Sequence, residues 1–355
     1  MTPARSELTG GSAKVSRRVG LIAIARFLLL LAPWAFIAYL FRDVDTALDT
    51  FGDASVAPIA GALLLMLVVL AAMALLWVRL VAHLNREATE PETLHLLRTF
   101  ARSWLARYLP GKVWVYGARV IHTDASVISR RIVASSLVDE LALIVGTATV
   151  LGLGLWTWFL AGPVVGLPVL LAGLAAVVVA VSRLDRLTHL ALRFLGRRLP
   201  RRWERVGQEL QRAGEDPRLG LRATALFTGS YLLNNFAGGL AFVLVVASLS
   251  DIGWDDVPLL AGAYSLAAVV GIAALFAPAG LGVREAVLAG FIAPVVASPV
   301  AASVVVLVRV LTIIADILFV GLVEATSAFS RRTAAGAVAR VPSGHHKSTP
   351  RDPGS

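Results

Sequence analysis

The chain has 355 residues, of which 57% are apolar and only 16% are charged, against about 25% in soluble domains. With a mean hydropathy of +0.76 and long apolar runs throughout, this composition excludes a soluble globular protein and predicts an all-α polytopic integral membrane protein. The absence of cysteine excludes disulfides and thiol nucleophiles, and the net charge of +10 comes from arginines beside apolar spans, which favours a membrane surface over nucleic acid as the partner.

About eight transmembrane helices are predicted along the chain, with two segments broken by glycine and proline as candidates for re-entrant structure. The first apolar run, 19–41, is too long for a signal peptide and carries Arg26, so it is expected to be retained as a helix. Further spans are expected at 56–78, 132–158, 163–181, 223–249, 257–276 and 299–323. The first break interrupts the mixed stretch 98–121, and the second, at 277–282, precedes a short helix at 283–292 that is marginal for a full crossing.

Basic residues orient these spans. Nearly all of the 33 lysines and arginines fall in 1–18, 79–131, 183–222 and 327–355, whereas the other loops carry aspartates. The positive-inside rule therefore predicts a multi-pass cell (plasma) membrane protein with both termini in the cytoplasm. This requires an even number of crossings, which eight satisfies if 283–296 crosses.

The predicted domain organisation is a cytoplasmic tail at 1–18, a membrane domain at 19–326 and a disordered cytoplasmic tail at 327–355. Within the membrane domain, the basic segment 183–222 is expected to form an interfacial helix on the anionic leaflet. The alternative is that its positive charges only set the orientation of the neighbouring spans. Two spans, a break and two more spans occur on each side of this segment. This pattern favours a parallel internal repeat with both breaks near the cytoplasmic face, the alternative being chance.

The first candidate site is the break at Pro110-Gly111, flanked by Arg107 and Lys112. Pro110 removes a backbone donor and Gly111 permits unusual dihedral angles, so a helix is expected to stop here. A helix–loop–helix that dips into the membrane would present the two cations and free backbone N–H groups to a lipid phosphate. The alternative is an ordinary elbow on the cytoplasmic surface.

The second candidate site is the break that contains Pro278, Gly280 and Gly282. Arg284 and Glu285 follow in the first turn of the next helix. At membrane depth two such residues either pair with each other or face a polar cavity. An anion site made by Arg284 and free N–H groups is predicted here. The alternative is a loop with a capping glutamate.

Charged residues inside the spans form a third group. Asp139 and Glu140 lie about eight residues into one span without a nearby cation in the same helix, which favours a functional role. Arg309 and Asp316 lie on one face of the last span, where a structural Arg–carboxylate clamp and a functional pair are both open. Insertion scales give a cost of roughly 2.5–3.5 kcal/mol for each such charge, so all four are expected to face the interior of the bundle.

Together these motifs resemble a known family. The run Tyr108-Leu109-Pro110-Gly111-Lys112, the later Asp139-Glu140 and the run from Pro278 to Glu285 are similar to the signature of the lysylphosphatidylglycerol synthase transmembrane-domain family. Its members include the flippase-like membrane half of the bacterial multiple-peptide-resistance factor. The resemblance covers about 19–326 and implies a helical module with re-entrant pieces that is associated with lipid translocation. One departure is Trp114, where the family often has glycine. Because no aminoacyl-transferase domain follows the last span, lysyl transfer from tRNA is not expected.

The expected function is that of a lipid flippase or lipid-handling transporter for an anionic, aminoacylated or polyprenyl-linked phospholipid. Arg107 and Lys112 would gather the phosphate, and the acids and Arg284 would line a polar path. The alternative is a membrane-embedded glycosyl or lipid transferase, or a non-catalytic partner of one. No nucleotide-sugar or metal motif supports the transferase, and no cofactor, metal or nucleic acid is expected. The sequence does not decide whether the protein forms a homodimer.

Overall fold

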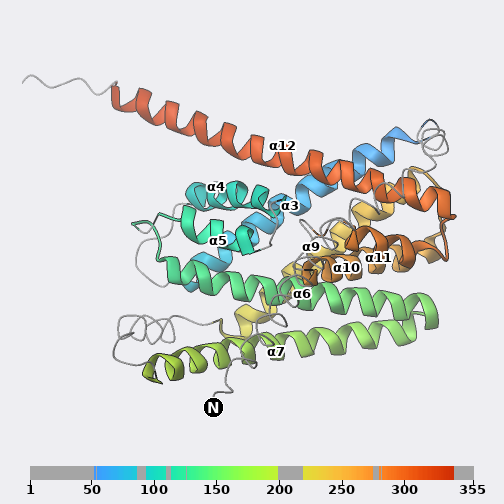
Figure 1. Ribbon diagram of the computed structural model, residues 1–355, viewed down its shortest axis with the longest axis horizontal. Helices are drawn as coiled ribbons and strands as arrows, with labels where there is room; N and C mark the ends of the chain where they lie inside the picture. Colours follow the sequence, from blue (N-terminus) through green and yellow to red (C-terminus); the bar gives the residue numbers. More distant parts are fainter. Residues whose placement is uncertain are drawn as a thin grey trace, which may run out of the picture.

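A computed structural model describes residues 52, 54–85, 93–108, 113–124, 126–198, 219–274, 280 and 282–339. In these residues every regular element is helical, and six helices are long and apolar enough to cross a membrane (Figure 1). The protein is therefore an all-α, multi-pass membrane protein, as its composition predicts. The predicted first span, 19–41, lies outside the described residues.

Five long helices run roughly along the long axis of the bundle in Figure 1: α3 (Val56–Leu84), α6 (Arg130–Ala161), α7 (Pro163–Arg198), α9 (Leu221–Ala247) and α12 (Ser298–Ala339). Two of them are longer than predicted. α7 continues into the basic segment 183–222, so the first part of that segment extends a span instead of forming a separate interfacial helix. α12 continues through Ala339, which contradicts the disorder predicted for 327–339; the alanine-rich sequence there has high helix propensity.

Contacts at the helix termini define two ends of the bundle. At one end the Ser55 N–H, just before α3, donates to the Ser248 carbonyl, just after α9, at 2.9 Å. At the other end Arg98 and Arg102 bind Glu324, near the C-terminal part of α12. We call these the Ser248 end and the Glu324 end. The arginine-rich segments of the described chain lie at the Glu324 end, and Asp251, Asp255 and Asp256 follow α9 at the Ser248 end.

Two helical hairpins enter the bundle from opposite ends, and the longer arm of the second is one of the six helices that are long enough to cross a membrane. The first consists of α4 (Thr93–Trp104), the 3₁₀ helix η1 (Leu105–Tyr108) and α5 (Val113–His122), and its two feet meet at the Glu324 end, where the Asp124 N–H donates to His95 Nε2 at 3.3 Å. The second consists of α10 (Val257–Ala273), which follows the 3₁₀ turn η3 (Trp254–Asp256), and α11 (Val283–Ile292). Its foot lies at the Ser248 end, where Phe291 packs edge-on against Trp156 of α6 with ring centroids 4.9 Å apart.

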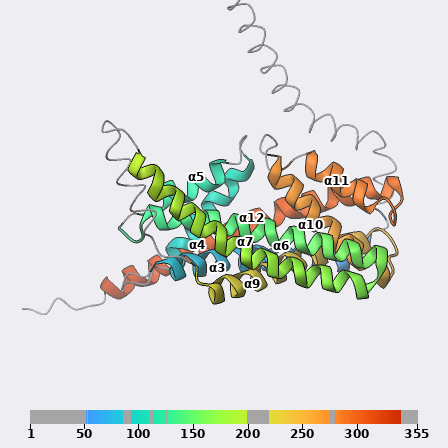
Figure 2. The same cartoon turned by 90° about the horizontal axis from the view of Figure 1, so that it is seen from below.

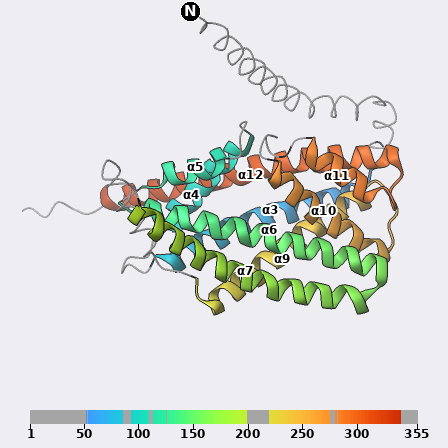
Figure 3. The ribbon, with the colours of Figure 1, turned by 60° about the horizontal axis from the view of Figure 1, so that its bottom comes forward.

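The second hairpin corrects the predicted topology. α11 has 10 residues, or about 15 Å at 1.5 Å per residue, whereas the hydrocarbon core is about 30 Å thick. Residues 283–296 therefore do not cross, and α11 returns to the end from which α10 entered. Because the two hairpins enter from opposite ends, any repeat between the two halves is inverted and not parallel. Figures 2 and 3 show the return arms α5 and α11 on the same side of the bundle, opposite α9.

The second hairpin packs on α6 through glycines. A Cβ built at Gly152 of α6 would lie 2.5 Å from Cγ of Leu266 and 3.2 Å from the carbonyl oxygen of Gly262, both in α10. Such close backbone approach is typical of membrane helices that associate through small residues. The glycine therefore sets the spacing between α6 and the hairpin.

Gly152→Leu should lower the stability of the protein by about 1–3 kcal/mol, because the new side chain overpacks this contact. Thermal unfolding in detergent measures the effect. The matched control is Gly229→Leu on α9, where nothing lies within 4 Å of the built Cβ and only helix propensity changes. Equal melting temperatures for the two variants would contradict the proposed packing.

Candidate functional site

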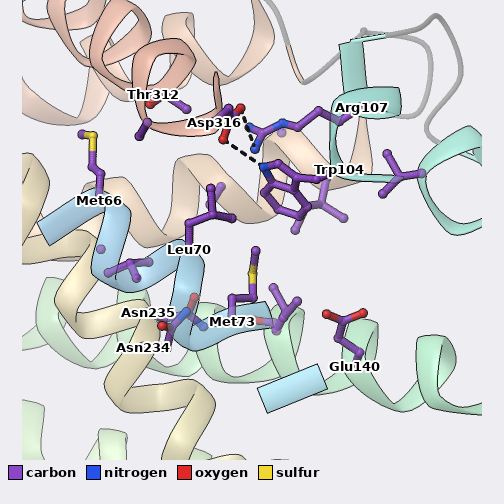
Figure 4. A pocket seen from close by; sticks show the side chains of 18 of the residues that line it. Met66, Leu70, Met73, Trp104, Arg107, Glu140, Asn234, Asn235, Thr312 and Asp316 are labelled. Carbon is purple, nitrogen blue, oxygen red and sulfur yellow. Dashed lines mark hydrogen bonds and ion pairs between the residues drawn. The ribbon is translucent and has the colours of Figure 1, made fainter. Parts of the chain in front are cut away.

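A cavity of about 300 Å³ lies at mid-depth, between the inner ends of the two hairpins (Figure 4). Its depth follows from its lining, which includes Leu70 and Asn235 near the middle of α3 and α9. One part of the wall is apolar, with Met66, Leu70 and Met73 on α3. The remaining wall carries four of the eight charged residues that the sequence singled out, Arg107, Glu140, Arg284 and Asp316.

Asp316 of α12 anchors the first hairpin to this wall. Its carboxylate accepts hydrogen bonds from Trp104 Nε1 at 2.9 Å and from the Tyr108 hydroxyl at 2.6 Å, and it lies 3.4 Å from Arg107 Nη1 (Figure 4). The Arg107 guanidinium also stacks 4.7 Å from the Trp104 ring centroid. Three side chains from one short segment thus converge on one buried carboxylate.

Arg309, two turns earlier on α12, anchors the second hairpin. Its Nη1 lies 3.5 Å from Glu285 Oε1, and the other oxygen of Glu285 accepts the Gly282 N–H at 2.8 Å, which caps α11. Gly282 has φ +79°, a left-handed conformation that favours glycine. Of the alternatives left open for Arg309 and Asp316, the clamp between the two is not what the structure shows: each residue binds one of the hairpins to α12. Arg309 also lies 5.6 Å from the Tyr108 ring, so the two anchors are adjacent.

Glu140 of α6 has a cation that the sequence did not reveal. Arg119 of α5 donates from Nη1 to Glu140 Oε2 at 2.5 Å, and the two side chains are only 1% and 2% exposed. The guanidinium packs against two neighbouring aromatic rings, 4.2 Å from the centroid of Phe100 and 5.0 Å from that of Trp77, and its Nε donates to Ser103 Oγ at 3.2 Å. The sequence shows no cation near Glu140 in its own helix, and the structure supplies one from another helix, because the first hairpin folds Arg119 against it.

Arg284 lies at the inner end of the second hairpin and lines the cavity. Its guanidinium lies 4.7 Å from the Tyr264 ring centroid, and a Cβ on Gly271 would meet its side chain at 3.2 Å. Glu285 pairs with Arg309 and not with Arg284, and it accepts the Gly282 N–H, so the capping glutamate expected as the alternative is present. Gly280, with φ +74°, packs on Gly271 at the same point.

The remaining predicted site residues are placed as follows. Asp139 is buried in α6 and is not among the residues that line the cavity. Asn235 donates to Thr147 Oγ1 at 2.9 Å, an interhelical hydrogen bond, and both it and its neighbour Asn234 line the cavity. Pro110, Gly111, Lys112 and Pro278 lie outside the described residues.

The charges around the cavity do not balance. Its described lining includes three guanidinium groups, from Arg107, Arg119 and Arg284, but only two carboxylates, from Glu140 and Asp316. Each carboxylate binds one of the first two arginines, so Arg284 is the arginine of this lining that has no ion pair with either, although Asp316 and Glu285 are near enough to act on its charge. Chemically, the arrangement suits a small anionic group held beside an apolar wall.

Comparison with known proteins agrees with this picture of a helical membrane module. No curated protein matches the chain significantly. The family description of the lysylphosphatidylglycerol synthase TM region matches residues 18–319, which include both hairpins and every helix that lines the cavity. Since the match covers most of the chain, the protein belongs to the lysylphosphatidylglycerol synthase TM region family.

Proposed function

We propose that the protein is a lipid flippase that moves a lipid with an anionic phosphate headgroup between the two leaflets. The observation that supports this most directly is the excess arginine charge in a cavity at mid-depth. A cation in the hydrocarbon region is energetically unfavourable unless a counter-charge lies close to it, so such residues usually have a function. A phosphodiester that passes through the cavity would supply that counter-charge.

The size and wall of the cavity agree with a headgroup site. About 300 Å³ is at the lower end of ligand-pocket volumes and is too small for a phospholipid with its acyl chains. The headgroup would therefore occupy the cavity while the chains remain in the bilayer. Met66, Leu70 and Met73 would contact the glycerol and the first methylene groups.

The opposed hairpins supply a route for alternating access. One hairpin closes the cavity from each end, and α12 holds the two through Asp316 and Arg309. Opening the first hairpin would expose Arg107 to one leaflet, and opening the second would expose Arg284 to the other. A binding site at mid-depth between inverted elements is the usual arrangement for alternating access in secondary transporters.

The orientation of this route can be tested because the chain has no cysteine. A cysteine at Asp255, at the Ser248 end, should react with an impermeant maleimide in intact cells, and one at Asp124, at the Glu324 end, should react only after permeabilisation. Both positions are exposed in the structure. Labelling of Asp124→Cys from outside would reverse the proposed orientation.

Translocation itself is tested with the purified full chain in liposomes. Fluorescent phosphatidylglycerol in the inner leaflet should become accessible to an external quencher faster than in protein-free vesicles. Fluorescent phosphatidylcholine, whose headgroup has no net charge, should move more slowly. Equal rates with and without the protein, for both lipids, would reject the proposed function.

A further inference from the structure

The pair formed by Arg119 and Glu140 differs from the other ion pairs around the cavity. Both side chains are almost completely buried, yet both contribute to the cavity lining. Arginine does not lose its proton in proteins, so this guanidinium needs one counter-charge at all times. In the structure Glu140 supplies it.

One of the two carboxylate oxygens of Glu140 is open to a proton. Its Oε2 accepts from Arg119, while its Oε1 is buried and has no hydrogen-bond partner among the described residues. The buried hydroxyl of Tyr231, on α9, likewise has none within the described part of the chain. The titratable groups that face Glu140 are Arg119 and Tyr116 from α5 and Tyr231 from α9. Oε1 of Glu140 can therefore take up a proton without losing a hydrogen bond.

An anion that enters the cavity changes the charge balance of the pair. With a phosphodiester beside Arg119, the guanidinium would have two negative partners in a site of low dielectric constant, and the two anions would repel each other. A proton on Glu140 removes that repulsion and leaves the phosphodiester as the single counter-charge.

We propose that Glu140 is a proton-binding site, and that the proton and the anionic headgroup bind together. This rests on the proposed function, because it assumes that the cavity takes the headgroup. Protonation converts the carboxylate to a carboxylic acid, and Arg119 turns from Glu140 to the phosphodiester. By thermodynamic linkage, if the bound headgroup raises the affinity of Glu140 for a proton, the bound proton raises the affinity for the headgroup by the same factor. A proton gradient could then drive the lipid.

The experiment uses the purified full chain and glycerophosphoglycerol, a soluble phosphodiester that carries one negative charge and does not titrate near neutral pH. Calorimetry in two buffers of different ionisation enthalpy gives both the affinity and the number of protons taken up. The native protein should take up close to one proton per bound molecule, and its affinity should fall by about tenfold per pH unit above neutrality. Glu140→Gln should bind without proton uptake and with an affinity that does not change with pH.

The matched control is Glu324→Gln, which neutralises a carboxylate at the Glu324 end and should keep the proton uptake of the native protein. If Glu140→Gln does not fold, the native measurement still decides, and the double variant Arg119→Gln with Glu140→Gln should bind more weakly with no proton uptake. Binding by the native protein without proton uptake would overturn the proton site and leave the flippase proposal intact. Absence of any binding would instead count against the headgroup cavity and remove the basis of both.

Discussion

Replacing Arg284 by glutamine should reduce translocation of anionic lipid roughly 10- to 150-fold, which corresponds to the loss of about 1.5–3 kcal/mol from a hydrogen bond to a charged group. Arg284 is the arginine of the described cavity lining without an ion pair to a lining carboxylate; its aliphatic chain packs on Gly271 and its guanidinium lies over the Tyr264 ring. Glutamine keeps part of the side-chain volume but removes the charge that would attract the phosphate. The liposome assay with fluorescent phosphatidylglycerol measures the change.

Two further variants separate phosphate binding from internal neutralisation. Arg284→Lys keeps the charge but loses the planar, two-pronged donor geometry, so its rate should lie between those of the native protein and Arg284→Gln. The double variant Arg284→Gln with Glu285→Gln should not regain translocation activity, because Glu285 is the ion-pair partner of Arg309 and caps α11. Arg222→Gln, which changes an exposed arginine at the start of α9, is the matched control and should have little effect. Full activity in the double variant would reject the phosphate role of Arg284.

The sequence predicts the fold class and the two breaks, because apolar runs long enough to cross a bilayer and Gly/Pro interruptions are local signals. It also predicts that Asp139, Glu140, Arg309 and Asp316 face the interior, since the cost of exposing a charge to lipid depends on depth and not on the partner. Three of these side chains are buried and that of Arg309 is largely buried, but Asp139 does not line the cavity.

Pairing could not be predicted, because it depends on which helices are neighbours. Arg119 is separated from Glu140 by a turn between two helices, and no periodicity links the two positions. The Arg309–Asp316 clamp looked favourable from their spacing on one helix face, but each residue has a partner in a different hairpin. The prediction of a parallel repeat was wrong for a related reason. Whether the repeat is parallel or inverted depends on whether 283–296 crosses the membrane, and hydropathy alone does not distinguish a short span from a return arm.

Arg119→Met should lower the stability of the protein by about 3–5 kcal/mol, the usual cost of removing one partner from a buried ion pair. The variant leaves the Glu140 carboxylate buried without its cation, and it removes the cation–π contacts with Phe100 and Trp77 that hold α5 against α3 and α4. Thermal unfolding in detergent, followed by loss of the monodisperse peak in gel filtration, measures the loss.

The stability of this variant should depend on pH in a defined direction. Below the range in which a carboxyl group in water loses its proton, Glu140 is neutral and needs no counter-charge, so the deficit of Arg119→Met should shrink as the pH falls and grow as it rises. Adding Glu140→Gln should restore most of the lost stability at neutral pH and abolish this dependence, because replacing both partners of a buried pair leaves no charge unpaired. The control is Arg102→Met, which removes an exposed partner of Glu324 and should cost at most about 1 kcal/mol. If Arg119→Met were as stable as this control, the buried pair would contribute nothing to holding the first hairpin, and its charge would be free for another role.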